Sequence, residues 1–107
     1  NIISTTAFDG MAWTSGSIYT SSKYALRGLT NSVRDELKDT GVSVVGVYPG
    51  GFQTDLFNEA KPSNFDEFMT AESVAEKIVN NLELEIPEVQ LIIKRPGQKQ
   101  SHEPAIN

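Results

Sequence analysis

Residues 42–51 read VSVVGVYPGG, a run of apolar and mostly β-branched side chains that ends in one proline and two glycines. This composition is typical of a strand that is covered on both faces of a sheet. The Pro-Gly-Gly sequence stops the strand, because proline donates no backbone hydrogen bond and glycine favours turns. We therefore expect a buried strand over residues 42–48.

A long helix is expected before this strand, from Ser17 to Asp39, because apolar residues recur at spacings of three, four and seven. Ser17 is suited to cap its amino end, and Gly41 is suited to a left-handed position just past its carboxyl end. The predicted apolar stripe consists of Ile18, Ala25, Leu26, Leu29, Val33 and Leu37. The charged residues that fall off this stripe and are expected to face solvent are Arg34, Asp35, Glu36 and Lys38.

A second helix is predicted after Thr70, a good N-cap residue, with Glu72 in the first turn, where a negative charge is favourable. Its predicted apolar stripe consists of Val74, Ile78, Val79 and Leu82. Two further strands are expected, one at residues 1–6, where a strand runs into a loop, and one at residues 89–93.

The order strand, helix, strand, helix, strand allows only parallel strands joined by right-handed crossovers, because the connections are long. The fold class is therefore α/β, a Rossmann-like doubly wound parallel sheet between two layers of helices. We assign residues 1–97 to this domain and residues 98–107 to a polar tail. Since a strand begins at the first residue with no turn before it, we expect only the carboxyl-terminal portion of the sheet, with one strand edge open.

The composition excludes several classes of function. The chain has 107 residues, with 14 acidic against 9 basic side chains, a net charge of −5 and no basic block. We therefore expect no nucleic-acid or anionic-membrane partner. The absence of cysteine excludes disulfides and thiol catalysis, and the acidic residues after Thr54 show no metal-ligand spacing, so no metal site is expected. No apolar run approaches the roughly 20 residues that span a bilayer and no signal peptide is visible, so we expect a cytoplasmic protein.

Tyr19 and Lys23 form a candidate catalytic pair. Their spacing of four places both side chains on one face of the helix, one turn apart. A free phenol loses its proton only at about pH 10, but a neighbouring ammonium and the amino end of a helix both favour the charged phenolate. Tyr19 could then act as a general acid and base near neutrality. Spacing alone also fits an ordinary surface pair, which is the commoner case.

Three motifs surround this pair in a fixed order. Residues 19–26 read YTSSKYAL, residues 33–37 read VRDEL and residues 47–54 read VYPGGFQT, and a hydroxyl-bearing run, Ser4-Thr5-Thr6, leaves the first strand. Strand ends of this kind are where doubly wound sheets bind ligands. In combination and order, these motifs resemble the short-chain dehydrogenase/reductase family, over roughly residues 1–95.

The resemblance implies an oxidoreductase that moves a hydride between NAD or NADP and a small-molecule carbonyl or secondary alcohol. It assigns proton transfer to Tyr19, and it assigns to Lys23 the support of the phenolate and the binding of the nicotinamide ribose. The family's substrate-binding serine lies thirteen residues before the tyrosine, which is Thr6 here, with Thr5 and Ser4 open because loop lengths vary. The implied cofactor-binding residues are Tyr19, Lys23, Pro49, Gly50, Phe52 and Thr54.

The family's glycine-rich phosphate-binding loop and its catalytic asparagine are absent from the 107 residues, so the choice between NAD and NADP is not made in them. We therefore expect the isolated chain to be inactive. Two alternatives to an enzyme stay open, namely a non-catalytic Rossmann-fold binding protein and an inactive fragment without the dinucleotide-binding half. The connection after Thr54, with Phe57, Phe65 and Phe68, is either a lid over the substrate or a seal of the core. The resemblance also implies a homo-oligomer, either a dimer or a tetramer.

Overall fold

The computed structural model describes residues 1–8, 16–54 and 63–95. In chain order its elements are the 3-10 helix η1 (Thr5–Ala7), helix α1 (Ser17–Glu36), strand β1 (Gly46–Pro49), the 3-10 helix η3 (Phe65–Glu67), helix α2 (Ala71–Leu82) and strand β2 (Gln90–Ile93). The predictions for the polar tail at residues 98–107 and for Phe57 lie outside the described residues.

Strand β1 is the middle of three parallel backbone segments. It pairs in parallel with β2 along its whole length. On its other side, Ile2 forms a parallel bridge with Val47, and backbone hydrogen bonds of 2.7 and 2.8 Å join residues 1–3 to Val47. The predicted parallel arrangement is confirmed. The strand is shorter than predicted, since it begins at Gly46, and Val42 is exposed in the irregular segment between the turn at Gly41 and the strand.

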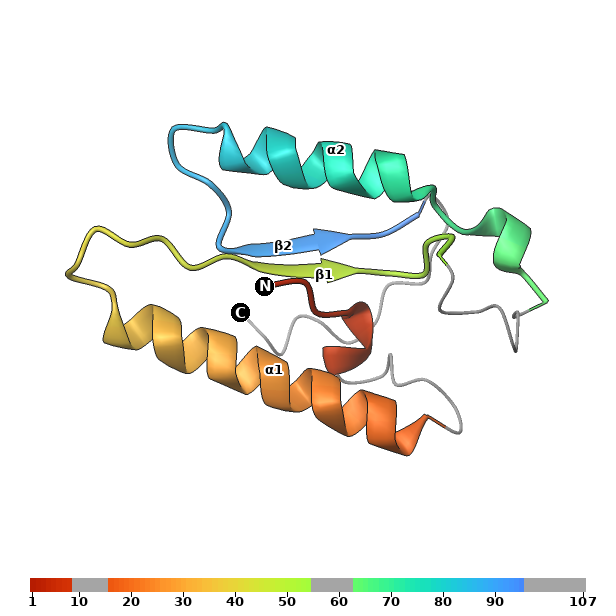
Figure 1. The fold of residues 1–107 in the computed structure, drawn as a ribbon, viewed down its shortest axis with the longest axis horizontal. Helices are drawn as coiled ribbons and strands as arrows, with labels where there is room; N and C mark the ends of the chain where they lie inside the picture. Colours follow the sequence, from red (N-terminus) through yellow and green to blue (C-terminus); the bar gives the residue numbers. More distant parts are fainter. Residues whose placement is uncertain (9–15, 55–62, 96–107) are drawn as a thin grey trace.

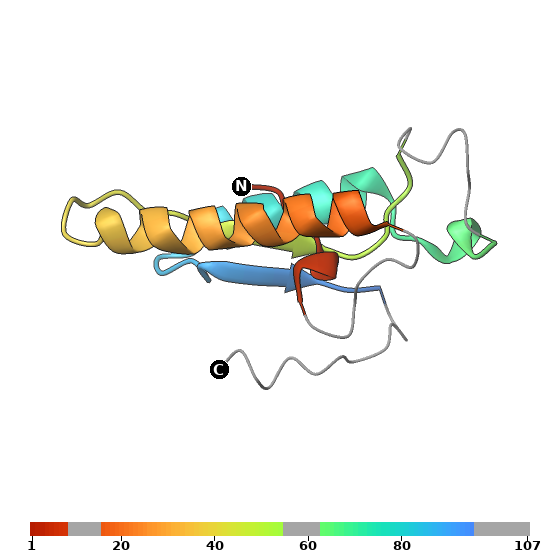
Figure 2. The ribbon, with the colours of Figure 1, turned by 90° about the horizontal axis from the view of Figure 1, so that it is seen from below.

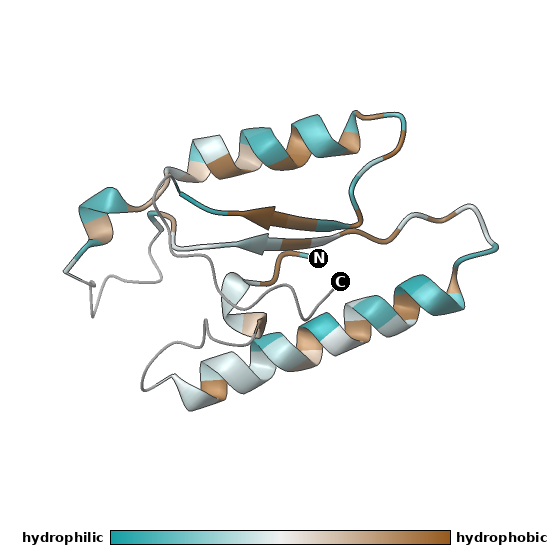
Figure 3. Cartoon of the chain, turned by 180° about the vertical axis from the view of Figure 1, so that it is seen from behind, coloured by the Kyte–Doolittle hydropathy of each residue, from teal (hydrophilic) through white to brown (hydrophobic). Residues whose placement is uncertain are grey.

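The two helices cover opposite faces of the sheet, as Figures 1 and 2 show together. Val47 and Tyr48 are neighbours in β1 and therefore point to opposite faces. Val47 packs in a cluster with Met69, Val74 and Ile93 on the α2 side. Tyr48 packs on the α1 side in a cluster with Ile3, Ala7 and Phe8, against which Leu26 rests. Figure 3 shows the hydrophobic character of β2 between the helices. The predicted fold class, a Rossmann-like sheet between two helical layers, is confirmed.

Helix α1 differs from its prediction at both ends. Gly16 is the N-cap, and Ser17 is the first helical residue. The helix ends at Glu36 rather than Asp39, because the chain then enters a turn that closes through a hydrogen bond from Thr40 N to Leu37 O. Gly41 has the expected positive φ of 81°, but it adopts this conformation at the end of the turn and not directly after the helix.

The buried face of α1 matches the predicted stripe only in part, at Leu26, Val33 and Leu37. Ile18 and Leu29 are 85% and 57% exposed, and Ala25 is exposed as well. The sheet-facing side instead carries Thr30, which is fully buried, with its Oγ1 donating to Leu26 O at 2.8 Å and accepting from the Asn1 side chain at 2.9 Å. The other half-buried positions on that side are Tyr19, Lys23, Leu26, Arg27, Val33, Arg34 and Leu37.

Arg34 was expected in solvent, but it is half-buried and ties α1 to the sheet. Its Nε donates to Val44 O at 2.9 Å and its Nη2 donates to Val89 O at 2.8 Å. These carbonyls directly precede β1 and β2. Val89 O also accepts from Gly46 N at 2.9 Å, so the guanidinium adds a second, charge-assisted hydrogen bond there and joins α1 to both strands. Asp35 and Lys38 are exposed as predicted and lie 3.7 Å apart.

Helix α2 begins as predicted. The Thr70 side chain accepts a hydrogen bond from Ser73 N at 3.1 Å, which makes it the N-cap, and Glu72 lies in the first turn. Val74 is buried and Ile78 is half-buried, but Val79 and Leu82 are exposed. A polar residue takes their place on the inner face. Asn81 is buried and exchanges two hydrogen bonds of 3.0 Å with the backbone of Glu88, which fixes the connection to β2.

We expect Tyr48→Phe to leave the free energy of unfolding unchanged or to raise it by about 1–3 kcal/mol at neutral pH. The Tyr48 hydroxyl is buried, and no hydrogen-bond partner for it occurs among the described residues. Its removal therefore relieves a desolvated polar group and leaves no large cavity. Urea denaturation of the full-length protein measures the change, and a loss of more than about 1 kcal/mol would contradict it.

The same substitution should alter the dependence of stability on alkaline pH. Burial raises the pKa of Tyr48 above its usual 10.0, and the charges of Arg27 and Arg34 oppose this only in part. The folded state thus holds the proton more tightly than the unfolded state, so this stability is present below pH 10 and is lost as the pH rises through the folded value. Denaturation on both sides of pH 10 should show a smaller loss in Tyr48→Phe than in the wild type.

Candidate active site

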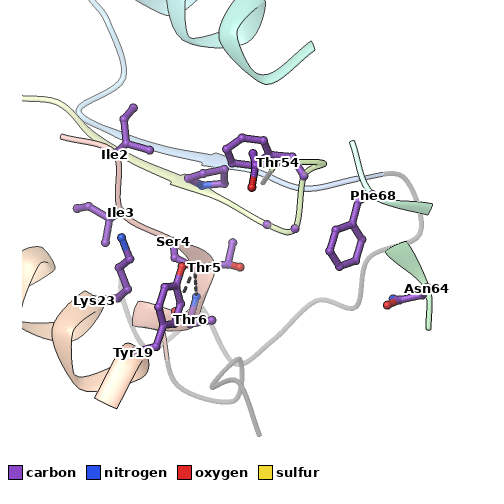
Figure 4. Close-up of a pocket in the computed structure, with 14 residues that line it drawn as sticks. Ile2, Ile3, Ser4, Thr5, Thr6, Tyr19, Lys23, Thr54, Asn64 and Phe68 are labelled. Carbon is purple, nitrogen blue, oxygen red and sulfur yellow. Dashed lines mark hydrogen bonds between the residues drawn. The ribbon is translucent and has the colours of Figure 1, made fainter. Parts of the chain in front are cut away.

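A cavity of about 420 Å³ opens at the carboxyl end of β1. Its walls come from four parts of the chain that the fold brings together. These are residues 2–6, the amino-terminal turns of α1, residues 49–54, and the two residues that flank η3, Asn64 and Phe68. Figure 4 shows side chains from these segments around one space. This is the edge of a doubly wound sheet at which ligands bind.

The hydroxyl-bearing run forms one wall of the cavity. Ser4 is the N-cap of η1, and its Oγ accepts from Thr6 N at 3.1 Å and from Thr6 Oγ1 at 3.0 Å. Ser4 and Thr5 are buried and Thr6 is half-buried, and all three line the cavity. Because Ser4 Oγ accepts twice within the turn, the remaining capacity of this hydroxyl is to donate its own proton.

Tyr19 and Lys23 form the facing wall. The spacing prediction holds, since Lys23 Nζ lies 5.4 Å from the centroid of the Tyr19 ring and both residues line the cavity. Figure 4 shows the two side chains beside the Ser4–Thr6 turn. Among the described residues that line the cavity, Lys23 carries the only formal charge. A negative group that forms in this space would therefore find its positive partner in Lys23.

The third wall contains Pro49, Gly50, Phe52 and Thr54, the other residues that the sequence predicted for the cofactor. Two backbone hydrogen bonds hold the segment from Pro49 to Thr54 against β2 and the residue before Thr70. Gly50 N donates to Ile93 O at 2.8 Å, and Gln53 N donates to Met69 O at 2.8 Å. The structure thus brings every sequence-predicted site residue to one cavity, while their individual roles stay predictions.

Five lining residues were not among the predicted site residues. The sequence predicts Phe68 as a lid or core residue, and it predicts Gly51 to end the strand within the motif at residues 47–54. A Cβ on Gly51 would lie 2.7 Å from the Phe68 ring, so a glycine is needed for the ring to reach this wall. The pattern of close packing on a glycine was not visible in the sequence, because Phe68 is seventeen residues away. The five are Ile2, Ile3, Gly51, Asn64 and Phe68.

No group of three acidic or histidine side chains that could hold a metal ion is found in residues 1–8, 16–54 and 63–95. None of the helices in these ranges is long and apolar enough to cross a membrane.

The family model described as short chain dehydrogenase matches residues 1–64, which contain the hydroxyl run, the Tyr19–Lys23 pair and the Pro49-Gly50 turn. The chain belongs to the short-chain dehydrogenase family. A solved short-chain dehydrogenase/reductase from Vibrio parahaemolyticus is 32% identical over 94% of this chain, with a TM-score of 0.69. The predicted family resemblance is confirmed.

Two other solved structures share the fold of this short-chain dehydrogenase. A short-chain dehydrogenase from Sphingobium yanoikuyae in complex with NADPH is 22% identical over 99% of the chain, with a TM-score of 0.70. A beta-ketoacyl-[ACP] reductase from Bacteroides thetaiotaomicron is 24% identical over 100% of the chain, with a TM-score of 0.65. The chain spans less than half the length of these three structures, of which it covers 45%, 40% and 41%.

Proposed function

We propose that the full-length protein is an NAD(P)-dependent oxidoreductase that interconverts a carbonyl compound and a secondary alcohol. One observation carries the proposal. The Tyr19 phenol, the Lys23 ammonium and the Ser4–Thr6 hydroxyls come from two separate elements and line a single cavity at the strand ends. A proton donor, a cation and a hydroxyl run around one space are the groups that carbonyl reduction requires.

The residues of the cavity fit the nicotinamide end of such a cofactor. The volume of about 420 Å³ is within the range of small-molecule sites. Lys23 can donate to ribose hydroxyls, and the wall from Pro49 to Thr54 offers backbone groups and a side-chain hydroxyl. When bound, the cofactor supplies or accepts the hydride. Either NAD or NADP is compatible with the proposal.

During reduction, Tyr19 gives its phenolic proton to the substrate oxygen while the carbonyl carbon receives the hydride. The phenolate that remains is stabilised by the ammonium of Lys23. A hydroxyl of the Ser4–Thr6 run donates to the same substrate oxygen and holds it in place. Ser4 is suited to this task, because the two hydrogen bonds that its oxygen accepts from Thr6 polarise its own O–H bond. Oxidation of the alcohol runs the same steps in reverse.

The proposal is tested on the full-length protein with a panel of aldehydes and ketones and with either NADH or NADPH. We expect the reduced nicotinamide absorbance to fall in step with alcohol formation. Saturable nucleotide binding without turnover of any carbonyl or alcohol would instead favour a non-catalytic binding protein. Turnover is then measured with NADH and NADPH present together, and the nucleotide that is oxidised faster is the preferred cofactor.

We also propose that the full-length protein is a homo-oligomer, a dimer or tetramer. The outer side of α1 supports this proposal, because Ile18 and Leu29 are exposed there on the side away from the sheet. We expect Leu29→Arg to reduce the molar mass measured by light scattering without changing the circular dichroism spectrum. A wild-type protein that is monomeric at micromolar concentration would contradict the proposal.

A further inference from the structure

Arg27 reaches from α1 to the turn that carries the hydroxyl run. It lies one helical turn after Lys23, and its Nη1 donates to Ala7 O at 3.1 Å. Its guanidinium carbon lies 4.3 Å from the centroid of the Phe8 ring. Ala7 is the last residue of η1, and both Ala7 and Phe8 are fully buried. The guanidinium is therefore held between a buried carbonyl and a buried ring at the end of η1.

Phe8 also packs against the central strand of the sheet. Its ring centroid lies 4.9 Å from that of Tyr48, in the tilted arrangement that aromatic pairs prefer. Tyr48 belongs to β1, so the chain of contacts runs from α1 through Arg27 and Phe8 to the central strand. The end of η1 is thus clamped between the helix and the sheet.

The contact between Arg27 and the end of η1 connects the cavity wall on α1 with the wall formed by the Ser4–Thr6 run. Tyr19, Lys23 and Arg27 follow one another at intervals of four on one side of α1. A single helix therefore carries the phenol, the ammonium and the guanidinium that holds the end of η1. Arg27 is not among the residues that line the cavity. Its contact is with the carbonyl immediately after the Ser4–Thr6 run. A shift of this carbonyl would move the hydroxyls relative to the phenol.

Burial of Arg27 is energetically unfavourable at one of its atoms, so packing alone does not explain an arginine at this position. Its Nε is buried, and no hydrogen-bond partner for it is found in the part of the chain that the structure describes. An unpaired buried donor is unfavourable, and a methionine of similar length would avoid it. The guanidinium therefore contributes something that an apolar side chain could not, namely a directed hydrogen bond to Ala7.

We propose that Arg27 is a positioning residue, which sets the distance between the Ser4–Thr6 hydroxyls and the Tyr19 phenol by holding the carbonyl of Ala7. The proposal rests on the proposed oxidoreductase function. Arg27→Met should lower kcat by about 10- to 100-fold, because small displacements of a reacting group have effects of this size. The KM for the nicotinamide nucleotide should change little, since Arg27 does not line the cavity.

A double-mutant cycle separates positioning from simple loss of stability. Alanine substitutions of Ser4, Thr5 and Thr6, made singly, first identify the hydroxyl whose loss costs most. That substitution is then combined with Arg27→Met in the full-length protein. If Arg27 acts through the hydroxyl, the double variant should lose at least about five-fold less kcat than the product of the two single losses. Arg27→Lys, which keeps a cation and a donor, should recover part of kcat.

Arg34→Met is the matched control, since Arg34 lies two turns later on the same helix and also binds backbone carbonyls. It should lower the free energy of unfolding, and its effect on kcat should multiply with that of the hydroxyl substitution. The proposal would be overturned if the losses of kcat caused by Arg27→Met and by the hydroxyl substitution simply multiplied in the double variant. An unchanged kcat in Arg27→Met would also overturn it. If Arg27→Met does not fold, the cycle with Arg27→Lys decides in the same way. A wild-type rate in Tyr19→Phe would instead overturn the proposed function.

Discussion

Tyr19→Phe is expected to lower kcat of the full-length protein by about 10²- to 10⁴-fold, the range usual for the loss of a general acid and base. The phenylalanine ring keeps the position of the tyrosine ring on α1 but has no proton to give to the substrate oxygen. Only one hydroxyl on a half-buried residue is removed, so the folded structure should persist. Steady-state rates of nicotinamide oxidation, with circular dichroism of the same samples, measure both expectations.

Tyr24→Phe provides the control for this substitution. Tyr24 lies on the same helix and is also half-buried, but it is not among the residues that line the cavity. The same hydroxyl is removed, so any general effect on α1 should be similar. We expect kcat to stay within about twofold of the wild type, as is usual for a residue away from the reacting groups. Equal rates for Tyr19→Phe and the wild type would show that Tyr19 is not the proton donor.

Lys23→Met should lower kcat/KM by about 10²-fold or more, the size of effect seen when one preorganised electrostatic partner is lost. It removes the only formal charge among the described residues that line the cavity, 5.4 Å from the centre of the Tyr19 ring. The phenolate formed on proton transfer would then lack its partner. Methionine keeps the length and much of the volume of the lysine stem, so the helix should remain folded.

Lys23→Arg refines this expectation, because it keeps the charge but replaces a compact ammonium by a planar fork. We expect an activity between those of Lys23→Met and the wild type. Lys38→Met is the matched control for loss of a lysine, since Lys38 is exposed and its only salt bridge within the described residues is with Asp35. Its kinetics should equal those of the wild type. A Lys23→Met variant with wild-type kcat/KM would exclude Lys23 from the mechanism.

The order and type of the main elements could be predicted from the amino-acid sequence. The β-branched run before Pro49 predicted a buried strand, and that strand is the centre of the sheet, with Val47 and Tyr48 on its two faces. Thr70 predicted the start of α2 to the residue. Such features depend on side-chain shape, backbone donors and caps. These properties are set by residues that are neighbours in the sequence.

The sequence also determined most of the candidate site. The spacing of Tyr19 and Lys23 requires that they share a side of the helix, and the order of the motifs required that they meet Ser4–Thr6 and the Pro49 turn at the strand ends. Parallel strands place their carboxyl ends at one edge of the sheet, so residues distant in sequence converge there. This convergence follows from topology and needs no knowledge of side-chain packing.

The side of α1 that faces the sheet could not be predicted from the sequence and depends on long-range packing. The predicted apolar stripe is divided, because Ile18, Ala25 and Leu29 are exposed while Leu26, Val33 and Leu37 are half-buried. The inner side also carries Thr30, Arg27 and Arg34. A hydrophobic period identifies an apolar side but not what covers it. Here the inner side must also line a cavity and donate hydrogen bonds to the carbonyls of Ala7, Val44 and Val89, so polar side chains that find partners across the fold are buried beside apolar ones.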